Sequence, residues 1–156
     1  MILQDTCKAF ITRTPGRWSR RLSIDVALLE KGHRFPPVAI VLDEAAVRQY
    51  LEAVEDAALP ALCRDEGQPW APPMAVAALA LRGLMEAMGL PAGAVHGSQE
   101  FEFRRPVAVG ERLASRAWVA HRSQRSGWLA LAVEMEATDE AGQAVLAGRA
   151  SVLIPQ

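Results

Sequence analysis

The segment "APPMAVAALALRGLMEAMGLP", residues 71–91, constrains the fold most strongly, because it predicts a helix that is stable only when protein surrounds it. Pro73 suits the first helical position and Gly89 suits the C-terminal cap. Between these two signals the segment is apolar nearly all round. A helix of that kind is buried on most sides, and about four turns are too short to span a membrane. We therefore predict a central helix over residues 73–88.

Four segments after this helix have the pattern of β-strands. In "SQEFEFRR", Phe101 and Phe103 alternate with charged residues, as in a half-buried strand. In "WLALAVEMEAT", alternate apolar residues line one face of the predicted strand; they are Leu129, Leu131, Val133 and Met135. The segments "ERLASRAWVAH" and "AVLAGRASVLIP" are the other long candidates, and "RSQRSG" and "TDEAGQ" supply turns. Consecutive strands with short turns predict an antiparallel sheet.

A second helix is predicted before the central one. An extended apolar run over residues 38–42 precedes Asp43, which suits a helix N-cap. Apolar residues then follow at helical spacing; they are Val47, Tyr50, Leu51 and Val54. This spacing predicts an amphipathic helix with one buried face that covers part of the core.

One buried helix followed by a long antiparallel sheet indicates an α+β protein, in which the sheet curls round a long central helix. This is the hot-dog fold. We expect residues 30–156 to form this domain and residues 1–29 to form an N-terminal arm packed on it. A single sheet of this kind leaves an edge strand and a helix flank uncovered, so a dimer with a second hot-dog subunit is expected.

Composition excludes several classes of function. The 17 basic and 18 acidic residues nearly cancel, so no excess charge attracts nucleic acid or an anionic membrane. No apolar run has the length of a membrane helix, and Cys7 and Cys63 belong to no metal-binding cluster. We expect a cytoplasmic protein without a metal site or another cofactor.

Several motifs together resemble the MaoC-like dehydratases, in particular their N-terminal or FAS1-like type. These are "KGHRFPPVAIVLDEAAVRQYLEAVED", "APPM", "VHGSQEFEFRRPVAVGERL" and "GRASVLIP", and they extend over residues 30–155. The resemblance implies a hot-dog subunit that binds an acyl thioester of coenzyme A or acyl carrier protein. It further implies the activity of an (R)-specific enoyl-thioester hydratase or 3-hydroxyacyl dehydratase.

Active members of this family carry an Asp-x4-His loop that holds and activates water, because hydration needs a base and an acid facing one water molecule. Placing that loop on "EDAALPALC" aligns Asp56 with the aspartate and Ala61 with the histidine. Asp56 is thus the candidate catalytic residue of an incomplete dyad. A solvated carboxylate at the end of a helix is the alternative interpretation of the same residue.

The junction before the central helix holds further candidates. The family has a His-Gly step there and a backbone N–H that stabilises the thioester oxyanion, whereas this chain has Pro72 and Pro73, so the donor would come from Met74. We predict substrate contacts for Trp70, Pro72, Met74 and His96. Core packing is the alternative for Trp70 and Met74, and a hydrogen bond to the backbone is the alternative for His96.

Three functions remain open at this point. The first is a hydratase or dehydratase that uses Asp56. The second is a non-catalytic partner of a subunit with an intact dyad. The third is a thioesterase in which the carboxylate of Glu86, on the central helix, activates water or attacks the thioester. Three other residues are expected to be non-catalytic: His33 in a loop, His121 exposed beside a hairpin turn, and Cys63 as an inert thiol.

Overall fold

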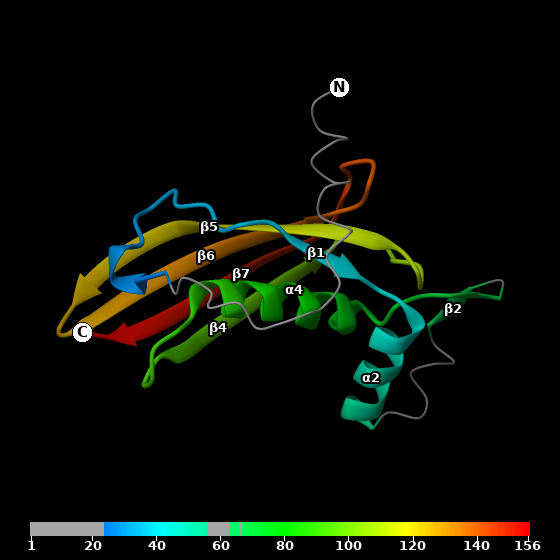
Figure 1. Ribbon diagram of the computed structural model, residues 1–156, viewed down its shortest axis with the longest axis horizontal. Coiled ribbons are helices and arrows are strands. Elements are labelled where there is room, and N and C mark those ends of the chain that lie inside the picture. Colours follow the sequence, from blue (N-terminus) through cyan, green and yellow to red (C-terminus); the bar gives the residue numbers. More distant parts are fainter. Residues whose placement is uncertain (1–23, 56–62, 66) are drawn as a thin grey trace, which may run out of the picture.

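The computed structural model describes residues 24–55, 63–65 and 67–156. These residues form an antiparallel sheet with a helix across one face (Figure 1). The helical elements are η1 (Val26–Leu28), α2 (Glu44–Val54) and α4 (Pro73–Met88). The strands are β1 (Val38–Val41), β2 (Arg64–Asp65), β3 (Gln68–Pro69), β4 (Val95–Phe103), β5 (Arg112–Arg125), β6 (Trp128–Thr138) and β7 (Ala144–Pro155).

The main sheet has five strands in the order β1-β5-β6-β7-β4, and every neighbouring pair is antiparallel. The sheet arches over α4 (Figure 1). This arrangement confirms the predicted α+β hot-dog fold. The helix has 16 residues, so it is of ordinary length and not the long helix that was expected.

The predicted signals at the ends of both main helices are confirmed. The Asp43 carboxylate accepts a hydrogen bond of 2.8 Å from the Ala46 N–H, which caps α2. Helix α4 begins at Pro73, and Gly89 follows it in the left-handed conformation, with a φ of 57°. Inside α4, Gly83 allows close packing on β1, because an added Cβ would lie 2.8 Å from Val38 Cγ1.

The core lies between α4 and the facing side of the sheet. On β6 the four predicted apolar residues are all buried, as are Val119 on β5 and Val152 on β7. Within the arm predicted for residues 1–29, Val26 and Leu29 belong to this core, and residues 1–23 lie outside the described part of the chain.

Three expectations about burial were wrong in part. Helix α4 was predicted to be buried on most sides, but Met74 in its first turn is 48% exposed. On α2, only Val47 of the predicted apolar face is buried. On β4, Phe103 is 40% exposed although the strand alternates as expected. The reason on β4 is its place at the edge of the sheet, where the described residues supply no further strand beside it.

The turn between β5 and β6 is tighter than predicted. Strand β5 continues to Arg125, so the connection consists of Ser126 and Gly127 only, both with positive φ. Two such residues form the hairpin turn that matches the twist of the strands. None of the helices that the structure describes has the length and hydrophobicity of a membrane span.

Candidate functional site

A pocket of about 410 Å³ lies at the N-terminal end of α4, and we call it the α4 pocket. Its walls come from the lead-in and first turn of α4, from the end of β4 with the loop that follows, and from the start of β7. The lining residues are Cys63, Trp70, Ala71, Pro73, Val76, Phe103, Arg104, Arg105, Pro106, Val107 and Val145. A mostly apolar lining and a volume in this range are typical of a small-molecule site.

Of the four residues predicted to contact substrate, the structure brings only Trp70 into the α4 pocket. Pro72 is buried at the N-cap of α4, and the half-exposed side chain of Met74 does not line the pocket. His96 is exposed near the start of β4, about 23 Å along the strand from Phe103. Trp70 and His96 are therefore not brought together in the structure.

The catalytic candidate Asp56 and the substituted position Ala61 lie outside the described residues. The donor predicted at the start of α4 can be described. Pro72 and Pro73 have no N–H, and the N–H groups of Ala75 and Val76 both donate to the Pro72 carbonyl oxygen, at 2.8 and 3.4 Å. The described residues supply no acceptor for the Met74 N–H. This N–H is one of the first-turn donors that a helix leaves without an intrahelical acceptor, at the positive end of the helix dipole.

Among the other sequence candidates, Cys63 lines the α4 pocket, whereas Glu86, His33 and His121 do not. Glu86 is exposed about 15 Å along α4 from Val76, so it is not a wall of the α4 pocket. His33 packs edge to face on Phe35 at 5.1 Å, and its buried Nε2 has no partner among the described residues. His121 is exposed, as predicted. Burial raises the pKa of the Cys63 thiol, so this wall residue is a poor nucleophile at neutral pH.

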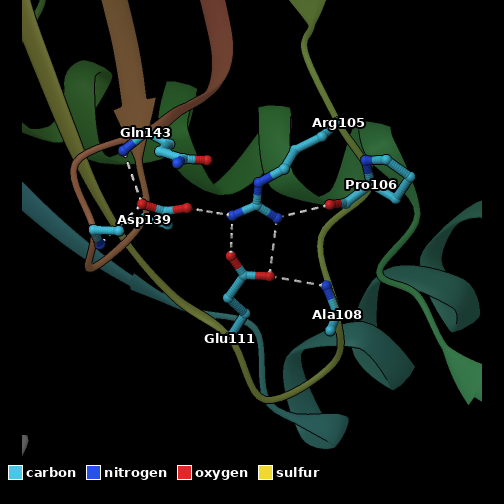
Figure 2. A network of polar contacts seen from close by, with 7 residues as sticks. Arg105, Pro106, Ala108, Glu111, Asp139 and Gln143 are labelled. Carbon is cyan, nitrogen blue, oxygen red and sulfur yellow. Dashed lines mark hydrogen bonds and ion pairs between the residues drawn. The ribbon is translucent and has the colours of Figure 1, made fainter.

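An ion-pair cluster that the sequence analysis missed includes Arg105, one of the residues that line the pocket (Figure 2). It consists of Arg105 in the β4–β5 loop, Glu111 at the end of that loop and Asp139 in the β6–β7 turn. The Arg105 guanidinium donates to both oxygens of Glu111 and, at 2.7 Å, to Asp139 Oδ2. The guanidinium holds the pKa of Glu111 below its usual value, and the Gln143 N–H together with the guanidinium does the same for Asp139. The two carboxylates in turn raise the pKa of Arg105.

The family model of the FAS1-like dehydratase domain region matches residues 30–147, which is most of the chain. The chain belongs to the MaoC-like dehydratase family, in its FAS1-like group. No match was found among curated protein sequences.

Solved structures share the fold of this FAS1-like protein at low identity. The (R)-hydratase from A. caviae involved in PHA biosynthesis has 21% identity and a TM-score of 0.68, with 82% of this chain and 98% of that chain covered. The 3R-hydroxyacyl-ACP dehydratase complex HadBC from Mycobacterium tuberculosis has 21% identity and a TM-score of 0.63, with 85% and 99% covered. The ChsH1-ChsH2 complex from the same organism has 12% identity and a TM-score of 0.62, with 81% and 98% covered. These likenesses confirm the hot-dog fold.

The cluster predicts how the stability of the FAS1-like protein depends on pH. Folding lowers the pKa of Glu111 and Asp139, so their ionised forms add to the free energy of unfolding. This contribution is complete above the pKa values of the unfolded chain, about 4.3 for Glu and 3.9 for Asp, and declines as the pH falls below them. We expect Asp139→Asn to lose less stability than the parent between pH 7 and pH 3, measured by urea denaturation. An equal decline in the free energy of unfolding of both proteins would contradict the lowered pKa of Asp139.

Proposed function

We propose that this FAS1-like protein binds an acyl thioester, carried by coenzyme A or by acyl carrier protein, in the α4 pocket. The observation that supports the proposal is the apolar pocket at the start of α4, where the Met74 N–H has no acceptor among the described residues. The apolar walls would hold the acyl chain. This N–H would donate a hydrogen bond to the thioester oxygen and stabilise the negative charge that develops there.

The reaction we propose for this site is that of an (R)-specific enoyl-thioester hydratase or 3-hydroxyacyl dehydratase. Hydration adds a hydroxyl group at C3 and a proton at C2, and negative charge develops on the thioester oxygen between these steps. Asp56 would take the proton of the attacking water as general base. The proton at C2 requires a second group, because Ala61 stands where the family has histidine.

A non-catalytic subunit is the second candidate, and two observations favour it. Ala61 leaves the dyad incomplete. In addition, the edge strand β4, beside which the described part of the chain places no further strand, and the half-exposed Met74 on α4 offer a surface for another hot-dog subunit. HadBC and ChsH1-ChsH2 are complexes of this fold. We therefore propose a dimer built from residues 30–156, either with a second copy or with a chain that carries an intact dyad.

The test is calorimetric titration of the purified protein with crotonyl-CoA and with a longer trans-2-enoyl-CoA, together with a hydration assay that follows the enoyl thioester absorbance. We expect binding in the titration. Turnover that disappears in Asp56→Ala would support the enzyme. Binding without turnover would support the partner subunit, and the absence of binding to both thioesters would contradict the proposed function.

A further inference from the structure

The β4–β5 loop of this protein, residues 104–111, lines the α4 pocket and is also bonded to the segment that leads into α4. Its residues Arg104, Arg105, Pro106 and Val107 line the α4 pocket. The same loop is bonded to the lead-in of α4, because the Ala71 N–H donates to the Val107 carbonyl oxygen at 2.8 Å and the Val109 N–H donates to the Pro69 carbonyl oxygen at 3.1 Å. Trp70 pairs with Ala108 between these two bonds. Displacement of the loop would therefore move two walls of the pocket.

The Arg105 cluster holds the same loop through a second set of hydrogen bonds. One terminal nitrogen of Arg105 donates to the Pro106 carbonyl oxygen at 2.8 Å and to Glu111, and the other donates to Glu111 and Asp139 (Figure 2). A guanidinium that binds a carboxylate through two nitrogens fixes direction as well as distance. The two ends of the loop are thereby held together and tied to the β6–β7 turn.

The carboxylates of the cluster are themselves held by backbone groups. Glu111 Oε2 accepts a bond of 3.1 Å from the Ala108 N–H. Asp139 Oδ1 accepts bonds of 2.9 and 2.8 Å from the N–H groups of Ala141 and Gln143. All four carboxylate oxygens are thus occupied, and the side chains of Arg105, Glu111 and Asp139 are only 33%, 22% and 14% exposed. Such a satisfied and partly buried network is rigid, unlike an exposed ion pair such as Arg104–Glu102.

We propose that the Arg105–Glu111–Asp139 cluster positions the β4–β5 loop against the lead-in of α4 and thereby sets the affinity of the α4 pocket for its ligand. The second half of this inference rests on the proposed function. Arg105 lines the pocket, but its guanidinium is already neutralised by two carboxylates. It is therefore a positioning residue and not the ligand of an anionic group.

The test compares Glu111→Gln and Asp139→Asn with Glu140→Gln, a matched control that alters an exposed carboxylate of the same turn outside the cluster. Hydrogen exchange is measured by NMR at the Ala71 and Val109 amides, with the Val133 amide of the central strand β6 as an internal reference. Both cluster variants are expected to accelerate exchange at Ala71 and Val109 by about tenfold or more, with little change at Val133. Affinity for crotonyl-CoA, measured by calorimetry, is expected to fall by about tenfold in the same variants.

Each outcome decides part of the proposal. Unchanged exchange at Ala71 and Val109, or equal acceleration at Val133, would overturn the positioning role whether or not the protein binds a thioester. Faster local exchange with unchanged affinity would overturn the link to the pocket. If the parent protein binds no thioester, the proposed function and the affinity half fail together, and the exchange rates still decide the positioning half.

Discussion

Replacing Leu131 by Ala is expected to lower the free energy of unfolding by about 2 to 5 kcal/mol, the usual range for a buried leucine. Leu131 is 1% exposed and lies on β6, which has a neighbouring strand on each side. Its side chain belongs to the core cluster between the sheet and α4. Truncating this side chain leaves a cavity. Strands that are hydrogen-bonded on both sides cannot readily move to fill it. Urea denaturation at one protein concentration measures the loss.

Leu153→Ala is the matched control for this substitution. Leu153 lies on the adjacent strand β7, where it pairs with Ala130, while Leu131 pairs with its neighbour Val152. Its side chain is 38% exposed because it faces away from the core. The same chemical change is therefore expected to cost about 1 kcal/mol or less. Equal losses in the two variants would contradict the assignment of inner and outer faces of the sheet.

The helix and the sheet of this FAS1-like protein could be predicted because their signals are local. Pro73 and Gly89 mark the ends of α4 within one short segment, and the alternation along β6 identifies its buried face directly. The identification of the family also relied on motifs within single segments. Exposure was predicted less well, because the burial of Met74 and Phe103 depends on which elements lie next to them.

The candidate site shows a second limit of sequence reasoning. The junction at Trp70 was found because it leads into the predicted helix, but His96 was added from the start of β4, far from the end of that strand that lines the pocket. The Arg105 cluster was missed because Asp139 is 34 positions from Arg105 and no local spacing connects them. The segment "QEFEFRRPVAVGERL" contains two of its three members, yet an arginine and a glutamate around a turn are common on protein surfaces.

Trp70→Ala is expected to weaken the binding of crotonyl-CoA by at least about tenfold, or about 1.4 kcal/mol. Trp70 is the largest side chain that lines the α4 pocket, and its indole ring offers apolar surface that a bound acyl chain would cover. Trp128→Ala is the matched control, because this second tryptophan is 41% exposed at the start of β6 and is not part of the pocket. Calorimetric titration of both variants measures the effect.

The pair of variants separates binding in the α4 pocket from binding elsewhere. A thioester held in the pocket loses affinity in Trp70→Ala and keeps it in Trp128→Ala. Loss of affinity in Trp128→Ala alone would place the ligand on the outer side of the β5–β6 hairpin. Equal affinity in both variants and the parent would mean that the acyl chain contacts neither tryptophan. The backbone beside Trp70 is joined to the β4–β5 loop by the Ala71–Val107 and Val109–Pro69 hydrogen bonds. Trp70→Ala and the cluster variants should therefore weaken binding through the same pocket. Their effects are then expected to be non-additive when combined.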